Sequence, residues 1–267
     1  MADLFSMKNR VVLLTGASRG LGRDMALALA GAGATVLCAG RTVKELDQTV
    51  RAIVRKGGNA HAVPLDITDE ADVLAKVGAI ISRHRRIDAL VNNAGIIHRQ
   101  DIVDTATPDF RKVIETNLIS QFVVSREVGR HMLARKYGRI VNISSVLGVV
   151  GRASVAGYVS AKHGLIGLTR TLAAEWGGRG VRVNAVCPGW IKTDMDVADQ
   201  DSGAYTDRDI VDRVPMARFA RPEDVAEAIA FLADGASSAF VNGVTLPVDG
   251  GWTADGSWDA LRVRTRA

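Results

Sequence analysis

The fold of this 267-residue chain is decided by the stretch Val11-Val-Leu-Leu-Thr15-Gly16-Ala-Ser-Arg-Gly20-Leu-Gly22. Its first five residues are a continuous apolar run with the length of a buried strand. Three glycines follow, and an amphipathic pattern then predicts a helix that continues to about Ala32. In such a strand, turn and helix, the backbone approaches a diphosphate closely and the helix N-terminus favours its negative charge. The stretch therefore predicts a dinucleotide-binding turn.

Apolar runs and amphipathic segments alternate along the rest of the chain. Further strands are predicted at residues 34–39, 60–65, 87–91, 139–143, 181–186 and 244–248, and helices at about 43–56, 69–83, 108–136, 155–177 and 222–234. This alternation predicts a parallel sheet that is covered on both faces. We therefore expect a single α/β domain over residues 1–267, a doubly wound Rossmann fold with a seven-stranded parallel sheet.

Two local features belong to this prediction. Thr68 is expected to cap the helix at 69–83, because a threonine oxygen accepts bonds from free helical N–H groups. Residues 193–216 have little periodicity and many aspartates, which predicts a long mobile substrate loop.

Composition excludes several classes of protein. Hydrophobic residues make up 47% of the chain, but the longest apolar stretches are too short to cross a membrane. Cys38 and Cys187 lie far apart, which argues for a reducing compartment, and we expect a cytoplasmic location. No histidine and cysteine cluster has metal-binding spacing, so no metal is expected. The net charge is +5, but most basic residues are scattered among acidic ones. This pattern indicates a solvated surface rather than a nucleic-acid partner.

Small and polar residues follow four of the predicted strands. They are Asp66, Asn92-Asn93-Ala94-Gly95, Ser144-Ser145 and Pro188-Gly189. The carboxyl ends of parallel strands meet at one edge of the sheet, where proteins of this class bind ligands. We expect these residues to surround the cofactor.

The second predicted strand ends at Gly40-Arg41, without a carboxylate. An acid at this position usually holds the ribose of NAD. Arg41 supplies positive charge instead, and Arg19 in the glycine turn is a second candidate to bind a 2′-phosphate. A surface position is the alternative for each arginine, but the missing acid favours NADP over NAD.

Tyr158-Val-Ser-Ala-Lys162 places a phenol and an ammonium one helical turn apart. A free phenol has a pKa of about 10, and a cation about 4 Å away can lower this value by roughly three units. Tyr158 would then be a usable proton donor and acceptor. Alone the pair is only suggestive, because a tyrosine and a lysine can take this spacing on a surface helix by chance.

The motifs occur together in one order. These are Thr15-Gly-Ala-Ser-Arg-Gly-Leu-Gly22, Asn92-Asn-Ala-Gly95, Asn117, Ser145, Tyr158-x3-Lys162 and Pro188-Gly189. Because it has all of these motifs, the chain resembles the short-chain dehydrogenase/reductase family from about Lys8 to Trp252. The resemblance implies NAD(P)-dependent interconversion of an alcohol and a carbonyl compound. It favours Ser145 as the catalytic serine and leaves Ser144 a structural role.

The resemblance also implies roles for single residues. Tyr158 would exchange the proton, Ser145 would bind the substrate oxygen, and Lys162 would bind the ribose and lower the pKa of Tyr158. Asn117 would hold a water molecule that links Lys162 to solvent, with a buried amide satisfied by backbone as the alternative. The expected cofactor contacts are Gly16, Ser18, Arg19, Gly20, Leu21, Gly22, Arg41, Asp66 and Ile67 (at the adenine), Asn93, Ala94, Gly95, Tyr158, Lys162, Pro188, Gly189, and Ile191 and Thr193 (at the nicotinamide).

Three functional interpretations remain open. Asn92 to Arg99, Leu4-Phe5 and Asp249 to Trp252 look like the gluconate 5-dehydrogenase and 2-deoxygluconate 3-dehydrogenase branch. In that case His98, Arg99 or Arg152 would meet the substrate carboxylate. The framework also resembles 3-oxoacyl-[acyl-carrier-protein] reductase, where basic residues near Lys136 and Arg179 would receive the carrier, with ordinary surface charge as the alternative. A dinucleotide-binding regulator without turnover is the third, and the intact catalytic set argues against it.

A homotetramer is also implied by the resemblance. The helices at 108–136 and 155–177 carry more apolar residues than one sheet face needs, with a place in the core as the alternative. These residues are Val123, Val124, Leu165, Leu168 and Leu172.

Overall fold

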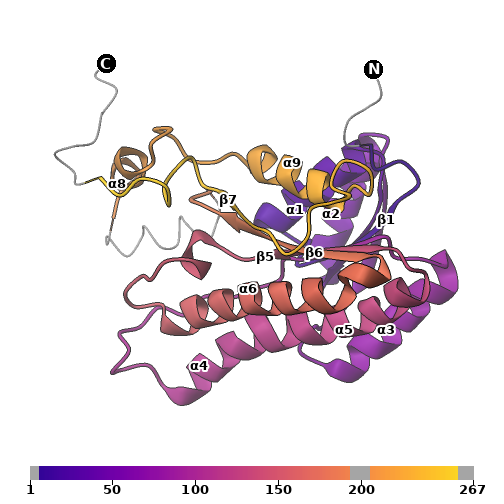
Figure 1. The fold of residues 1–267 in the computed structure, drawn as a ribbon, viewed down its shortest axis with the longest axis horizontal. Coiled ribbons are helices and arrows are strands. Elements are labelled where there is room, and N and C mark those ends of the chain that lie inside the picture. The colour runs from indigo at the N-terminus through magenta and orange to yellow at the C-terminus, as the bar shows by residue number, and fades with distance from the viewer. Residues whose placement is uncertain (1–5, 193–204, 258–267) are drawn as a thin grey trace.

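The computed structural model describes residues 6–192 and 205–257. Its centre is a seven-stranded sheet in the order β3-β2-β1-β4-β5-β6-β7, and all neighbouring strands are parallel (Figure 1). The strands are β1 (Val11–Thr15), β2 (Thr35–Gly40), β3 (Asn59–Pro64), β4 (Ala89–Asn92), β5 (Gly138–Ile143), β6 (Val181–Pro188) and β7 (Thr245–Val248). The predicted doubly wound parallel sheet is confirmed.

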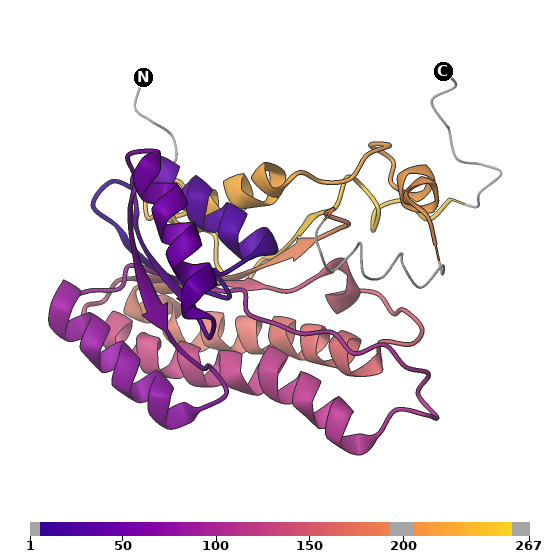
Figure 2. The ribbon, with the colours of Figure 1, turned by 180° about the vertical axis from the view of Figure 1, so that it is seen from behind.

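Helices cover both faces of the sheet. The α-helices of the described residues are α1 (Gly20–Gly31), α2 (Val43–Arg55), α3 (Glu70–His84), α4 (Thr107–Ile114), α5 (Ser120–Ala134), α6 (Ala156–Trp176), α8 (Asp207–Arg213) and α9 (Pro222–Ala233). Figures 1 and 2 show α1, α2 and α9 on one face and α3, α5 and α6 on the other. In β1, Leu14 packs into the core on one face of the sheet and Leu13 into the core on the other, and neither is exposed. Burial on both faces is why the strand sequences are continuous apolar runs.

The chain reverses its direction of travel across the sheet between β3 and β4. β1 pairs with β2 along one edge and with β4 along the other, so β4 joins the sheet beside the first strand. The backbone N–H of Val11 donates to Oδ2 of buried Asp88 at 2.9 Å and ties the two strands at their start. Ligands of doubly wound sheets bind at the carboxyl ends on either side of such a reversal.

The long helix expected at 108–136 is divided. α4 and α5 are joined by a π-helical segment, η1 (Glu115–Ile119), which contains Asn117. The hydroxyl of Ser120 donates to the carbonyl of Thr116 at 2.6 Å within this irregular turn. Single π turns inside longer helices are frequent at functional sites.

Two further predictions are corrected. The cap of α3 is Asp69, whose carboxylate accepts from the N–H groups of Ala71 and Asp72, whereas the hydroxyl of Thr68 donates to Asp66. The expected loop at 193–216 contains the helix α8. Thr206 and Asp209 form a capping box at the start of this helix. Residues 193–204 of that loop lie outside the described residues.

The apolar residues offered for a tetramer interface belong mainly to the core. Val124 and Leu165 are fully buried, Val123 and Leu172 are 7% exposed, and Leu168 packs against the same layer. The apolar excess of these helices therefore covers the sheet.

Candidate active site

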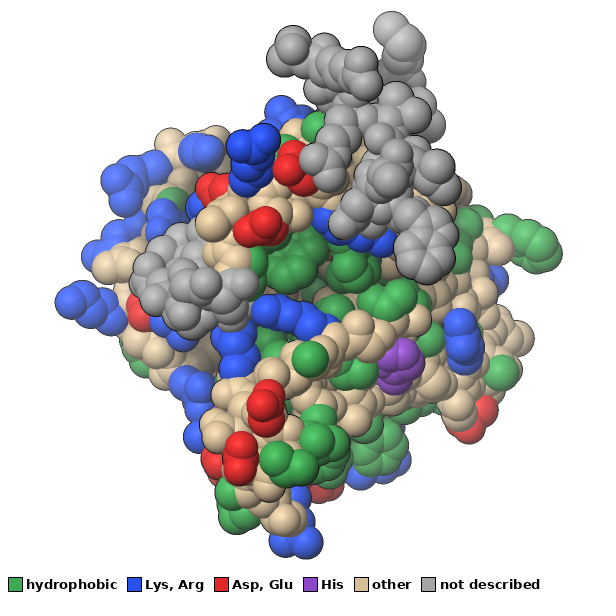
Figure 3. All heavy atoms as spheres, turned by 90° about the vertical axis from the view of Figure 1, so that its left-hand side faces the viewer, with side chains coloured by type: hydrophobic (Ala, Val, Ile, Leu, Met, Phe, Trp, Pro, Cys, Tyr) green, Lys and Arg blue, Asp and Glu red, His purple; other side chains and the backbone are tan. Residues whose placement is uncertain are grey.

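A cavity of about 770 Å³ opens at the carboxyl ends of the strands. Figure 3 faces the hollowed side of the molecule. The predicted residues that line it are Gly16, Ser18, Arg19, Gly20, Leu21, Gly22, Arg41, Asp66, Ile67, Asn93, Ala94, Gly95, Arg99, Ser145, Arg152, Tyr158, Lys162, Pro188, Gly189 and Ile191. Asn117 and His98 are not among the residues that line it, and Thr193 lies outside the described part of the chain.

The glycine turn packs directly against the turn that follows β4. Gly16 has φ +67°, and a Cβ atom there would lie 2.8 Å from Cα of Ala94. A Cβ on Gly22 would lie 1.9 Å from the carbonyl oxygen of Gly16. A larger residue at either position would force the two turns apart and fill the approach to the helix N-terminus.

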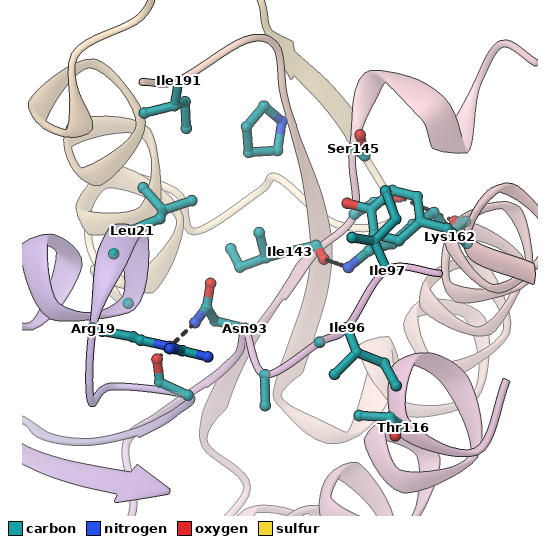
Figure 4. Close-up of a pocket in the computed structure, with 18 of the residues that line it drawn as sticks. Arg19, Leu21, Asn93, Ile96, Ile97, Thr116, Ile143, Ser145, Lys162 and Ile191 are labelled. Carbon is teal, nitrogen blue, oxygen red and sulfur yellow. Dashed lines mark hydrogen bonds between the residues drawn. The ribbon is translucent and has the colours of Figure 1, made fainter. Parts of the chain in front are cut away.

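Asn93 joins these two turns through its side chain. Its Nδ2 donates to the carbonyls of Thr15 and Gly16 at 3.1 and 3.2 Å, and its backbone N–H donates to the hydroxyl of Thr15. Figure 4 shows Asn93 and Arg19 facing the same space. Arg19 is the N-cap of α1, and the first turn of that helix carries no acidic residue. This cradle fits the diphosphate of a dinucleotide.

The far end of the cavity lies at the ends of β2 and β3. Arg41 is exposed there, close enough to Asp66 for its charge to help lower the pKa of that carboxyl. The larger cause of this lowered pKa is the N–H of Thr68, which donates to Asp66 at 3.0 Å. Glu45, in the first turn of α2, lines the same region and was not predicted from the sequence.

Lys162 is held at the inner end of the cavity. It is 4% exposed, and Nζ donates to the carbonyl of Ile143 at 2.7 Å (Figure 4). Burial lowers the pKa of this ammonium to about 8. The charge that would face a cofactor ribose is therefore fixed at the end of β5, in a low-dielectric environment.

Tyr158 and Ser145 meet at the same end. Burial raises the pKa of the Tyr158 phenol, while a hydrogen bond with Ser145 and the charge of Arg99 act in the opposite direction. Nζ of Lys162 stands 5.5 Å from the centre of the Tyr158 ring and is directed at the Ile143 carbonyl. This arrangement leaves the lowering of the Tyr158 pKa by Lys162 as a prediction.

Asn117 is fully buried behind the site. Its Oδ1 accepts from the N–H of Ile96 and its Nδ2 donates to the carbonyl of Ile96, both at 2.8 Å. The amide is thus satisfied by backbone, the alternative considered from the sequence. Its side chain braces the strand-end turn, and the water molecule expected at Asn117 stays a prediction.

The outer wall of the cavity is aromatic and basic. The guanidinium of Arg152 lies over the rings of Trp190 and Tyr205, with its Cζ at 5.4 and 5.6 Å from their centres. The two rings contact each other edge to face at 5.5 Å. Trp190 and Tyr205 were not predicted, and the only sequence signal is that Trp190 directly follows Pro188-Gly189.

Three further features concern the described residues as a whole. The helices found over residues 6–192 and 205–257 lack the combined length and apolarity that a bilayer span requires. Within the same residues no cluster of three or more histidine, cysteine, aspartate or glutamate side chains is arranged to hold a metal ion. Cys38 and Cys187 are both buried free thiols.

Known proteins are similar to this chain over most of its length. A family model described as Enoyl-(Acyl carrier protein) reductase matches residues 16–253. A 2-dehydro-3-deoxy-D-gluconate 5-dehydrogenase of Bacillus subtilis is 38% identical over 94% of this chain and 97% of its own. A 3-oxoacyl-[acyl-carrier-protein] reductase of Synechocystis is 40% identical over 91% of this chain and 96% of its own.

A solved structure extends the likeness to three dimensions. The gluconate 5-dehydrogenase of Burkholderia cenocepacia J2315, in complex with NADP and tartrate, superposes with a TM-score of 0.90. It is 35% identical and the match covers 95% of this chain and 98% of that one. Since both the sequence and the fold match over most of the chain, the chain belongs to the short-chain dehydrogenase/reductase family of NAD(P)-dependent oxidoreductases.

Proposed function

We propose that this enzyme interconverts an alcohol and a ketone on a sugar acid such as gluconate, with NADP as its cofactor. The observation that carries the proposal is that Ser145, Tyr158 and Lys162 line one cavity together with Arg99 and Arg152. The first three supply the proton chemistry, and the two arginines supply positive charge for a carboxylate.

The residues of the site divide the work. NADP, when bound, would accept or supply the hydride. Tyr158 would take the proton of the substrate hydroxyl, and Ser145 would hold the substrate oxygen in the geometry that this transfer needs. Lys162 would bind the ribose hydroxyls through its ammonium.

The preference for NADP rests on the far end of the cavity. Arg41 lines the region beyond β2, where a 2′-phosphate would lie, and Arg19 lines the adjoining turn. Charge-assisted bonds to a phosphate are strong. The Burkholderia enzyme, which has the same fold, was solved with NADP.

The sugar-acid substrate rests on the outer wall and on the relatives. Two of the compared enzymes are named for gluconate-type acids, and the Burkholderia structure also holds tartrate, another carboxylate. His98 is half-buried and is not one of the cavity-lining residues, so Arg99 and Arg152 are the better candidates to meet the carboxylate.

A carrier-bound acyl substrate is the second candidate, favoured by the Synechocystis relative. Lys136 and Arg179 would have to receive the carrier. They precede β5 and β6 at the amino ends of the strands, whereas the cavity lies at the carboxyl ends. A carrier bound there would face away from this cavity.

A regulator without turnover is disfavoured because the catalytic residues converge on one cavity.

A cytoplasmic homotetramer is part of the proposal. Ile119 and Phe122, on one side of the η1–α5 segment, are 43% and 41% exposed, and Phe240 is fully exposed. These side chains would be buried if this part of the surface packed against further copies of the chain. Light scattering should give four chain masses, and a monomer would exclude the assembly.

The decisive experiment is turnover on a matched substrate panel. We expect NADP reduction with gluconate but not with glucitol, the polyol that lacks the carboxylate. Reduction of an acetoacetyl thioester with NADPH is the control for the second candidate. Activity with the thioester and none with gluconate would overturn the proposed substrate.

A further inference from the structure

The end of β5 holds helix α6 through two reciprocal bonds at one residue. The hydroxyl of Ser144 donates to the backbone carbonyl of Lys162 at 3.0 Å, and Nζ of Lys162 donates to the carbonyl of Ile143 at 2.7 Å. Ser144 is 3% exposed, and its N–H also donates to Val186 of β6. Backbone and side chain of Lys162 are thus both fixed to adjacent residues of one strand.

Two neighbours are fitted to the Ser144 hydroxyl. The thiol of Cys187, on β6, lies close enough to interact with it, although burial is the larger influence and raises the pKa of that thiol. Gly148 is buried beside it, and a Cβ atom there would lie 2.3 Å from the Ser144 Oγ and 3.0 Å from the Lys162 carbonyl oxygen. The glycine therefore leaves the space in which this bond forms.

We infer that Ser144 is a positioning residue, which sets the height of α6 against the sheet and so places Tyr158 and Lys162 relative to Ser145. Tyr158 lies one turn before Lys162 on the same helix face. A shift of the helix at Lys162 moves both side chains, while Ser145 stays on the strand. The inference rests on the proposed function only for the substrate used to measure turnover.

A second tie on the same helix provides a matched control. Nδ2 of Asn142 donates to the hydroxyl of Thr169 at 2.9 Å, and Thr169 is fully buried. Thr169 is two helical turns beyond Lys162 and does not line the cavity. Thr169→Val removes a buried hydroxyl, and with it a bond between the same helix and the same strand. It leaves the turn that carries Tyr158 unchanged.

The first measurement is the ionisation of Tyr158 with saturating NADP. The chain has three tyrosines, so the tyrosinate absorbance of each protein minus that of its Tyr158→Phe counterpart isolates this phenol. We expect Ser144→Ala to move the midpoint to higher pH, because the hydrogen bond with Ser145 that favours ionisation is weakened. Thr169→Val should lower the thermal midpoint and leave this titration unchanged.

The second measurement is turnover of gluconate. Ser144→Ala should lower kcat by about 10-fold to 100-fold, as expected for a displaced catalytic group, with little change in the KM for NADP. Gly148→Ala, which retains the hydroxyl but crowds it, should cause a similar loss. In the double variant the two losses should not multiply, because both act through one bond.

The outcomes separate the inference from its alternatives. A wild-type titration and kcat in Ser144→Ala would overturn it, and so would an equal titration shift in Thr169→Val, which would indicate general loosening. If Ser144→Ala does not fold, Gly148→Ala gives the same test. If the wild-type protein does not oxidise gluconate, the proposed substrate fails, whereas the Tyr158 titration still decides the role of Ser144.

Discussion

The two ends of the cavity are built in different ways. At the inner end, Ser144, Ser145 and Lys162 are at most 9% exposed, and each makes a hydrogen bond with protein atoms. At the far end, beside the ends of β2 and β3 and called the outer end below, Arg41 is exposed and Asp66 is half-buried. Charge interactions are strong in the first environment and screened by water in the second.

This contrast separates chemistry from cofactor choice. The inner end depends on the position of two strands and a helix, so a change there disturbs several bonds at once. The outer end depends on single side chains with water around them, so one substitution can alter selectivity without disturbing the fold. Substitutions at the two ends should therefore differ in size and in kind.

Tyr158→Phe at the inner end should have the largest effect. The ring and its packing remain, but the proposed acid and base is lost. We expect turnover to fall by about 10²–10⁴-fold, as is typical for loss of general acid–base catalysis, with NADP binding retained. Steady-state rates and NADPH fluorescence measure the two quantities. Substantial turnover in this variant would show that another group carries the proton.

Lys162→Met should separate stability from activity. Burial lowers the pKa of Lys162 from 10.5 to about 8, so at neutral pH the folded protein carries a charge that the unfolded chain holds more favourably. The variant should be more stable there by on the order of 3 kcal/mol, while its turnover and cofactor affinity both fall.

The stability difference between Lys162→Met and the wild type should depend on pH. Between about pH 8 and pH 10.5 the unfolded wild-type chain binds a proton that the folded protein has released, so wild-type stability rises with pH. The advantage of the variant should shrink across this window. Denaturant unfolding near neutral and near pH 10 measures it, and a less stable variant at neutral pH would mean that the bond to Ile143 outweighs the cost of burial.

Arg41→Asp at the outer end should have a smaller effect, and it should change the selectivity between NADP and NAD. Removal of a charged hydrogen bond to a phosphate should shift the ratio of kcat/KM for NADP and NAD by roughly 10-fold to 100-fold toward NAD. Lys44→Asp is the matched control, because it makes the same charge change on neighbouring α2 without lining the cavity. An equal shift in the control would attribute selectivity to the general field, and a wild-type preference for NAD would refute the assignment.

Features that depend on local pattern could be predicted from the sequence. Continuous apolar runs gave the parallel strands, and the glycines gave the turn beside β1. The residues at the ends of β4, β5 and β6 meet in one cavity because parallel strands bring their carboxyl ends together. Only the pairing of Tyr158 with Lys162 followed from spacing, whereas the roles of Ser145 and Asn117 came from the family resemblance.

Features that depend on packing could not be predicted. The π turn at Glu115–Ile119 has no signature in an apolar pattern that runs through it. Thr68 and Asp69 are both good caps, and only the bond from Thr68 to Asp66 decides between them. The stack of Arg152 on Trp190 and Tyr205 joins three separate segments. For α8, the pair Thr206 and Asp209 was a usable signal.

The placement of β1 also determines how the sheet is assembled. β1 gains β2 from the neighbouring segment of chain, but its other partner, β4, must arrive from far along the sequence, as the bond from Val11 to Asp88 across 77 residues illustrates. Closure of so long a loop is slow. During synthesis, the apolar edge of β1 is therefore unpaired until β4 has left the ribosome, and its need for protection from aggregation is greatest in that interval.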